Sequence, residues 1–367
     1  MKKVKKAYLI LESGEVIEGE AIGAERESVG ELVFTTGTVG YLETLTDPSY
    51  AGQIVIQTFP MIGNYGVIPE DFEGKSALSG YVVREICDAP SNFRSKGTLD
   101  SYLKEAGIPG ICGVDTRYLT KLIRDRGVMN AKIAYSVPEN TDDIKSFEIG
   151  DAVSRVTMEK TVVYPADGEK KYTVILVNYG VKGNIVKCLC KRGCEVIEVG
   201  ADTSPSEILA YSPDGVVLSN GPGDPKANGY RIDVIKRIVG HVPIFGICLG
   251  HQLLALALGG DTEKLKFGHR GANQPVKEVG GTRTFITSQN HGYAVIAKSL
   301  EGIGKESFVN ANDGSCEGMD YPSRMCSSVQ FHPEANAGPR DTEFLFDRFT
   351  SYMDLIMTTG GEGLAEG

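Results

Sequence analysis

The residues best suited to covalent chemistry lie in Gly246-Ile247-Cys248-Leu249-Gly250, between an apolar run and a stretch of good helix formers. This order predicts a strand, a sharp turn that carries Cys248, and a helix. Glycine on either side permits the strained turn of a nucleophile elbow, because it has no Cβ to clash with neighbouring strands. The helix dipole favours the thiolate form of a cysteine placed there. So short a motif also surrounds cysteines that are simply buried, so a nucleophilic role for Cys248 requires a matching base.

The matching base and its orienting acid are His332 and Glu334, in segment 328–334. The segment reads as a strand, and residues two apart on an extended chain point the same way. A carboxylate beside an imidazole accepts its Nδ1–H, fixes the tautomer and stabilises the imidazolium formed during proton transfer. We therefore predict that His332 activates Cys248 and then protonates the leaving group. His291 is the alternative base, ranked second because no acid stands two residues from it.

Two further polar segments could contribute to the same site. Residues 219–225 (Ser-Asn-Gly-Pro-Gly-Asp-Pro) follow an apolar run, and a glycine-rich loop at the end of a parallel strand can present backbone N–H groups to a developing oxyanion. Residues 288–293 (Ser-Gln-Asn-His-Gly-Tyr) form a second polar cluster that could bind the polar ends of a small substrate. The remaining histidines have no evident partner in the sequence, and we expect them to be structural or at the surface: His241, His251 and His269.

Continuous apolar runs at residues 173–177, 215–218 and 242–247 must position these groups. Such runs are typical of strands buried on both faces of a parallel sheet. Each is followed by a loop and a helical segment, and alternating strands and helices predict a doubly wound α/β domain. In that fold the binding site lies beyond the carboxyl ends of the strands.

The chain of 367 residues is long for one core, so two domains are expected. Its first 150 residues contain short alternating stretches that predict a β-rich domain, with a helix at 116–126 that Gly127 ends. The C-terminal tail has too little apolar content to pack. The expected organisation is a β-rich domain (1–150), a linker (151–171), an α/β domain (172–357) and a disordered tail (358–367).

Composition narrows the class of protein. Apolar residues make up 41% of the chain and charged residues 23%, as in soluble globular proteins, and the net charge of −10 argues against a nucleic-acid-binding surface. No apolar run reaches the roughly 18–20 residues that span a bilayer, and the N-terminus lacks the apolar region of a signal peptide, so a cytoplasmic location is expected. The eight cysteines should then be reduced thiols. Cys188 and Cys190 would face opposite sides of a helix, so we expect no metal there.

The motifs together resemble those of a known family. Residues 246–252, residues 220–225 and His332-Pro333-Glu334 resemble the class I (triad) glutamine amidotransferases. The resemblance runs from about Ala7 to Tyr352 and extends to the small, glutaminase subunit of carbamoyl-phosphate synthetase. The segments that carry this extension are residues 46–50 (Thr-Asp-Pro-Ser-Tyr), 113–117 (Gly-Val-Asp-Thr-Arg) and 288–293.

The resemblance implies a β-rich N-terminal domain followed by a class I glutamine amidotransferase domain. It implies a triad of Cys248, His332 and Glu334, with a γ-glutamyl thioester on Cys248. Because Ser49 is among the implied contacts, glutamine would bind near the interface of the two domains. The glutamine contacts that it implies are Ser49, Gly221, Gly223, Leu249, Gln252, Asn290, Gly292 and Tyr293.

The family also implies a partner, the large synthetase subunit, which uses ATP, bicarbonate and a divalent metal (Mg²⁺) and receives ammonia through a tunnel. Gly74-Lys75-Ser76 resembles the end of a phosphate-binding loop, but Pro69 stands where that loop requires glycine. We therefore expect no cofactor and no metal on this chain. The sequence leaves open whether the product feeds arginine synthesis, pyrimidine synthesis or both, and which higher oligomer forms.

Three alternatives remain at this point. The glutaminase component of another synthetase, such as those making anthranilate or GMP, would share the triad but not the first 150 residues. A non-catalytic scaffold would be expected to have lost a member of the triad, whereas all three are present. A free-standing hydrolase would show steady glutamine hydrolysis without a partner.

Overall fold

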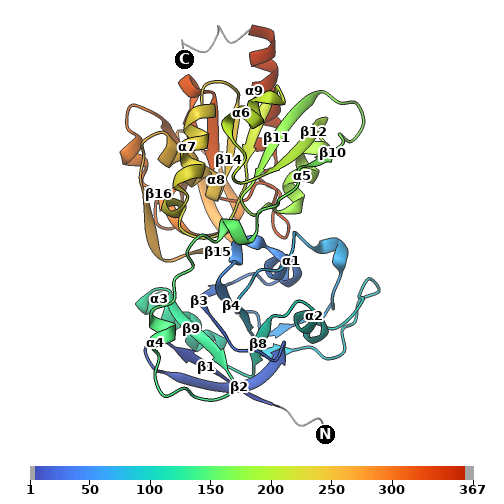
Figure 1. The fold of residues 1–367 in the computed structure, drawn as a ribbon, viewed down its shortest axis with the longest axis vertical. Helices are drawn as coiled ribbons and strands as arrows, with labels where there is room; N and C mark the ends of the chain where they lie inside the picture. Colours follow the sequence, from blue (N-terminus) through green and yellow to red (C-terminus); the bar gives the residue numbers. More distant parts are fainter. Residues whose placement is uncertain (1–4, 360–367) are drawn as a thin grey trace. The chain divides into compact units, whose positions relative to one another are not determined.

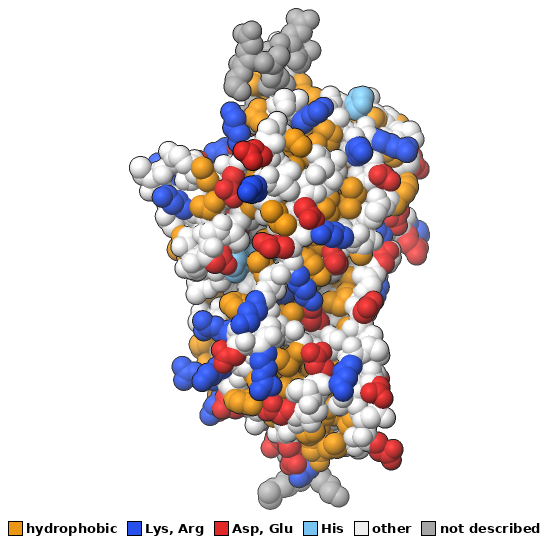
Figure 2. All heavy atoms as spheres, turned by 90° about the vertical axis from the view of Figure 1, so that its left-hand side faces the viewer, with side chains coloured by type: hydrophobic (Ala, Val, Ile, Leu, Met, Phe, Trp, Pro, Cys, Tyr) orange, Lys and Arg blue, Asp and Glu red, His pale blue; other side chains and the backbone are white. Residues whose placement is uncertain are grey.

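A computed structural model describes residues 5–359 of the chain. The chain forms two compact units, Met1–Ala152 and Val153–Gly367, and each is described by itself. Within the described part of the chain, no helix is both long and apolar enough to cross a membrane. On the face drawn in Figure 2, lysines and arginines are interspersed with aspartates and glutamates.

The N-terminal unit is built on a closed barrel with strand order β1-β2-β8-β6-β4-β3-β9 (Figure 1). Antiparallel pairing of β1 with β9 closes the barrel. The barrel strands are β1 (Lys6–Leu11), β2 (Val16–Gly23), β3 (Ser28–Thr35), β4 (Gln53–Gln57), β6 (Gly80–Val82), β8 (Pro109–Cys112) and β9 (Met129–Ala134). The unit's other elements are α1 (Tyr41–Thr46), β5 (Met61–Ile62), β7 (Glu85–Ile86), α2 (Leu99–Glu105), α3 (Thr116–Arg126), α4 (Asp142–Lys145) and the short 3-10 turns Pro48–Tyr50 and Pro69–Asp71.

Helix α3 has the bounds that its sequence predicts. Its first turn is capped by Asp115, whose side chain accepts from the N–H of Tyr118. Gly127 follows with φ of 99°, a conformation that favours glycine and ends the helix.

The C-terminal unit is built on a 10-stranded sheet of order β10-β12-β11-β13-β14-β19-β18-β17-β15-β16. Strands β12, β11, β13, β14 and β19 are parallel, which confirms the α/β fold class. The strands are β10 (Val162–Tyr164), β11 (Tyr172–Asn178), β12 (Cys194–Gly200), β13 (Gly215–Leu218), β14 (Ile244–Ile247), β15 (Thr262–Glu278), β16 (Thr284–Val295), β17 (Lys305–Asn310), β18 (Cys316–Tyr321) and β19 (Cys326–Val329). The helices are α5 (Gly183–Cys190), α6 (Pro205–Ala210), α7 (Gly229–Ile238), α8 (Leu249–Ala257) and α9 (Phe344–Thr359), with 3-10 turns at Val153–Arg155, Pro225–Ala227, Ala297–Leu300 and Pro322–Arg324.

Both faces of the parallel strands are buried, as their continuous apolar runs predict. Along β11, Ile175 and Val177 pack into one core with helices α6, α7 and α8, while Val174 and Leu176 pack into the other with α5 and α9 (Figure 1). Successive side chains of a strand point to opposite faces, so a strand covered on both sides must be apolar throughout.

The segment 151–171, expected to be a linker, contains more structure than a connection. Strand β10 lies in it and pairs antiparallel with β12 at the edge of the sheet. Three residues are too few to show an alternating pattern against polar surroundings, which is why the sequence did not reveal the strand. At the other end, α9 includes residues 358 and 359, and the rest of the expected disordered tail lies outside the described residues.

Candidate active site

Cys248 lies at the turn between β14 and α8, where the sequence places a nucleophile. It is the N-cap residue of α8, with φ of 54° and ψ of −103°, a backbone conformation that a residue with a Cβ rarely adopts. Its N–H donates to the carbonyl of Val329 at 2.9 Å, which ties the turn to β19. Cys248 is buried, so the strained turn is held by the packed strands around it.

The two glycines that flank Cys248 are required by close backbone contacts. A Cβ on Gly246 would lie 2.8 Å from the carbonyl oxygen of Gly250, and one on Gly250 would lie 2.2 Å from that of Leu218. Both distances are shorter than real Cβ contacts. The glycines therefore let α8 begin directly against β13 and β14, which confirms the predicted geometry of strand, turn and helix.

His332 follows β19 and contacts Glu334. The N–H of His332 donates to the carbonyl of Ser288 at 2.9 Å, and its Nδ1 lies 2.7 Å from Oε1 of Glu334. The strand is shorter than the sequence predicted, because β19 ends at Val329. Pro333 and Glu334 lie in a turn beyond it. The imidazole and carboxylate thus meet across a turn, because the fixed φ of proline bends the chain there.

The second nitrogen of His332 is directed to the nucleophile. Nε2 is buried and has no hydrogen-bond partner within the described part of the chain, and the Cys248 side chain interacts with the ring and raises the pKa of His332. Burial alone lowers the pKa of His332, but the charges of Glu334 and Cys248 outweigh burial and raise it to about 10. His332 is therefore a buried imidazole oriented by an acid on one side and adjoining a thiol on the other, as proton transfer to and from His332 requires.

Lys182 is a member of this site that the sequence did not reveal. Its Nζ lies 3.1 Å from Oε1 of Glu334, and both side chains are almost completely buried. Burial raises the pKa of Glu334, but the charges of Lys182 and His332 outweigh burial and lower it to about 2. Asn184 also donates to the backbone carbonyl of Glu334. The only sequence signal for Lys182 is its place just beyond the carboxyl end of β11, the edge at which such folds build sites.

The glycine-rich loop after β13 lies against the start of α8. The carbonyl of Ser219 accepts from the N–H of Gly250 at 3.0 Å. A Cβ on Gly221 would lie 2.4 Å from the carbonyl oxygen of Tyr179 and 2.8 Å from a methyl group of Leu249. Gly221 and Leu249 therefore lie together beside Cys248, where their backbone N–H groups could face an oxyanion. Gly223 adopts φ of 89° in the same loop.

The second polar cluster, on β16, lies on the other side of the nucleophile. The Cys248 Sγ is 3.7 Å from the carbonyl oxygen of Asn290. Gln252, one turn along α8, donates through Nε2 to the carbonyl of Tyr293 at 2.8 Å and to Oε1 of Gln330 at 2.9 Å. The structure thus brings these residues around Cys248, and their contacts with glutamine remain a prediction, as does that of Gly292.

His291 is engaged elsewhere. Its Nδ1 faces the carbonyl of Tyr293 at 2.8 Å, and its Nε2 faces Gln289 and His269. Both of its nitrogens are thus in contacts away from Cys248, so the geometry favours His332 as the base. His251 and His269, expected to be structural or at the surface, are buried and hydrogen-bonded: Nδ1 of His251 lies 2.8 Å from the Ser328 hydroxyl, and Nε2 of His269 lies 2.8 Å from a carboxylate oxygen of Asp313. Both partners are far away in sequence, which is why the sequence did not reveal them.

Two remaining predictions concern residues outside this cluster. Ser49 lies in the 3-10 turn of the N-terminal unit, where its N–H donates to the Asp47 side chain, and its contact with glutamine stays a prediction. Cys188 and Cys190 are free, buried thiols on α5. Burial raises the pKa of both, to about 12 for Cys188, so neither is a reactive thiol.

Comparison with known proteins shows the family of the chain. A family model described as glutamine amidotransferase class-I matches residues 175–352, and one described as carbamoyl-phosphate synthase small chain, CPSase domain, matches residues 9–133. Among curated relatives, the carbamoyl phosphate synthase small chain of Listeria innocua is 49% identical over 356 residues, covering 95% of this chain and 97% of the relative. The carbamoyl phosphate synthase small chain of Bacillus anthracis is 48% identical over 366 residues, covering 97% of this chain and 98% of the relative. The chain therefore belongs to the carbamoyl phosphate synthase small-chain family and carries a class I glutamine amidotransferase domain.

Proposed function

We propose that this chain is the glutaminase subunit of a carbamoyl phosphate synthase, with Cys248, His332 and Glu334 as its catalytic triad. The observation that carries the proposal is the buried series in which Lys182 holds Glu334, Glu334 holds Nδ1 of His332, and His332 adjoins Cys248 at a nucleophile elbow. That series supplies a nucleophile, a proton carrier and an orienting acid for acyl transfer.

The reaction divides into two acyl transfers. The Cys248 sulfur attacks the side-chain amide carbon of glutamine, and the oxyanion that forms is stabilised by backbone N–H groups of Leu249 and Gly221. The C–N bond breaks as His332 gives its proton to the nitrogen, which leaves as ammonia. Water then adds to the γ-glutamyl thioester and gives a proton to His332, and glutamate leaves as the thiolate is restored. No cofactor on this chain takes part in these steps.

Substrate binding would use groups from both walls of the site and one from the N-terminal unit. The proposed contacts lie on the loop after β13, at the start of α8, on β16 and in the 3-10 turn at Pro48–Tyr50. They are Gly221, Gly223, Leu249, Gln252, Asn290, Gly292, Tyr293 and Ser49. Because Gln252 already donates to Tyr293 and Gln330, it would shape the pocket wall as well as contact the substrate.

The partner in this proposal is a large synthetase subunit that binds ATP and Mg²⁺ and combines ammonia with bicarbonate. The family to which the chain belongs is named for a small chain, which supports a heterodimer as the working unit. Transfer between subunits has a chemical reason, since ammonia released into neutral water would be protonated and lose its nucleophilic lone pair. We place this complex in the cytoplasm, where ATP and bicarbonate are available.

The test is glutamine hydrolysis and carbamoyl phosphate formation by the complex of this chain with a large subunit from the same cell. The wild-type chain should be slow alone and accelerated by the partner with ATP and bicarbonate. A complex with Cys248→Ser should make carbamoyl phosphate from an ammonium salt but not from glutamine. Hydrolysis that survives Cys248→Ser would show that the triad is wrong, and full hydrolysis without any response to the partner would identify a free-standing hydrolase.

A further inference from the structure

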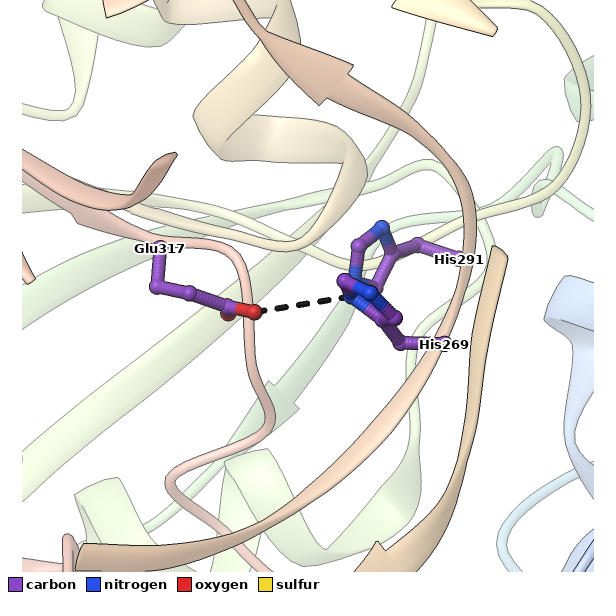
Figure 3. Close-up of side chains that lie close together, drawn as sticks. All are labelled: His269, His291 and Glu317. Atoms are coloured by element: carbon purple, nitrogen blue, oxygen red, sulfur yellow. Dashed lines mark hydrogen bonds and ion pairs between the residues drawn. The ribbon is translucent and has the colours of Figure 1, made fainter. Parts of the chain in front are cut away.

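A second cluster of buried polar side chains lies on the β15–β16 hairpin. His269 and His291 stand directly opposite one another in the register of the two strands, and Glu317 reaches them from β18 (Figure 3). One nitrogen or oxygen of each lies within 4.8 Å of the other two, and all three residues are buried. We propose that His269, His291 and Glu317, with Gln289 as a fourth ligand, form a binding site for a divalent transition-metal ion such as Zn²⁺.

The hydrogen bonds of His291 determine which of its nitrogens has a lone pair available. Its Nδ1 lies 2.8 Å from the carbonyl oxygen of Tyr293, and since a carbonyl only accepts, Nδ1 carries the hydrogen. Nε2 of the neutral ring therefore presents a lone pair. It lies 3.0 Å from Oε1 of Gln289, an atom that also presents lone pairs.

The orientation of Gln289 is fixed by its own partners. The hydroxyl of Thr287 donates to the carbonyl of Gln274 at 2.9 Å, so its oxygen must accept from the amide of Gln289. Nε2 of Gln289 lies 3.1 Å from that oxygen, which leaves Oε1 facing His291. The contact between His291 and Gln289 therefore joins two acceptor atoms, which repel each other. A cation bound between them would make the contact favourable.

His269 also directs a nitrogen lone pair toward Nε2 of His291. Its Nε2 lies 2.8 Å from a carboxylate oxygen of Asp313, so that nitrogen carries a hydrogen, and Nδ1 of the neutral ring presents a lone pair. This Nδ1 is 3.2 Å from Nε2 of His291 and 3.6 Å from Oε1 of Glu317. Four acceptor atoms thus converge from three strands. One added proton could bridge only some of these contacts, whereas a metal ion could satisfy all four.

The separations suit tetrahedral coordination. Ligands about 2.0–2.1 Å from Zn²⁺ lie about 3.3 Å from one another, and three of the separations between the ligand atoms in the structure are 3.0, 3.2 and 3.6 Å. The remaining distances within the His269, His291 and Glu317 group are no longer than 4.8 Å, so a bound ion would draw the carboxylate inward. Two imidazoles and a carboxylate are ligands that zinc and similar ions accept, and the amide oxygen of Gln289 would complete the fourth position.

The surroundings resemble those that support metal ligands. In metal sites each histidine donates its second N–H to an oxygen, as His269 does to Asp313 and His291 to Tyr293. Ligating carboxylates are themselves hydrogen-bonded, and Oε1 of Glu317 accepts from Asn310 at 2.8 Å. The other oxygen of Glu317 is buried with no hydrogen-bond partner among residues 5–359. No spacing motif links ligands so far apart in sequence, which is why the sequence indicated no metal.

The experiment measures binding of Zn²⁺ and Co²⁺ to the full chain carrying Cys248→Ser, which removes the reactive thiol as a competing ligand. We expect binding of one metal ion per chain and, with Co²⁺, the intense visible absorption of a tetrahedral site. Asp313→Asn should weaken affinity by about 10- to 100-fold, as expected for loss of a group that orients a ligand. Asp313 is about half exposed, so this variant should fold. His269→Gln should abolish the absorption.

The matched control is His241→Gln, because His241 is exposed and lies outside the cluster. It should bind metal as the Cys248→Ser chain does. The proposal is overturned if the Cys248→Ser chain binds neither ion, in which case a shared proton occupies the cluster. It is equally overturned if Asp313→Asn and His269→Gln bind as tightly as the control. The measurement uses no glutamine, so its outcome is independent of whether the proposed glutaminase activity is correct.

Discussion

Removing the positive charge of Lys182 should destabilise the C-terminal unit and disable the triad. The perturbation is Lys182→Met, which keeps the length of the side chain. Unit charges 3.1 Å apart attract by about 5 kcal/mol at an effective dielectric constant of about 20. Lys182 also repels the imidazolium of His332 and lowers its pKa, so its loss gives back part of that energy. We expect a net cost of about 3–4 kcal/mol, within the range for a buried charge that loses its partner.

The assay is thermal unfolding of the full chain at neutral pH. For a unit of this size, that cost lowers the midpoint of unfolding by about 6–16 °C. The matched control is Lys226→Met, because Lys226 pairs with Asp261 at 2.6 Å but both side chains are more than half exposed. An exposed pair contributes little to stability, so the control should unfold close to the wild type.

The stability that the Lys182–Glu334 ion pair contributes should depend on pH. Glu334 has a pKa lowered to about 2, below the usual value of 4.5, so its ion pair contributes fully above about pH 4.5 and is lost as the pH falls toward 2. Without Lys182 the carboxyl group would protonate at higher pH. The difference in stability between the wild type and Lys182→Met should therefore narrow below pH 4.5. Equal stability of Lys182→Met and Lys226→Met at neutral pH, or a difference that does not change with acid, would refute this account.

Three further perturbations address the elbow, the acid and the base. Gly250→Ala should slow alkylation of Cys248 by iodoacetamide, because its Cβ would lie 2.2 Å from the carbonyl oxygen of Leu218. The control is Gly229→Ala, whose Cβ would have no described atom within 4 Å apart from its chain neighbours and its own helix backbone, and equal rates would contradict the elbow. Glu334→Gln should lower kcat for glutamine by about a thousandfold or more with less effect on KM, as loss of an orienting carboxylate does; an unchanged kcat would remove Glu334 from the triad. The pKa of His332 is raised to about 10, so its charge stabilises the fold fully below about pH 6.5 and is lost as the pH rises toward 10. Urea unfolding from pH 6 to 10 should show this decline in the wild type and not in His332→Gln.

Local sequence patterns were sufficient to predict the elements that depend only on residues close together in the chain. The apolar run before Cys248 and the helix formers after it gave the elbow, and the bounds of α3 followed from its apolar face and Gly127. These features depend on residues within one turn or one strand of each other. For that reason they are visible without knowledge of the fold.

Contacts between distant segments were not predictable in the same way. Lys182 and Glu334 are separated by more than a hundred residues, and neither has a neighbour in sequence that marks the pair. The same holds for His269 and Glu317, which meet only because β15 and β18 both flank β17. A short edge strand such as β10 was missed because its burial depends on β12. Where a function rests on such pairings, sequence reasoning needs a family resemblance to reach it.

The order of charges in the site explains how several buried ionisable groups can coexist. With Cys248 as a thiolate and His332 as an imidazolium, the series Lys182, Glu334, His332 and Cys248 alternates positive and negative, and its net charge is zero. Each buried charge therefore has an opposite neighbour, which offsets the cost of removing it from water. When the thiolate attacks an amide, its negative charge moves to the substrate oxygen while His332 gives up its proton to the leaving nitrogen. The Lys182–Glu334 pair stays unchanged through both steps, so it can hold the imidazole in place while the reacting half of the series exchanges charge.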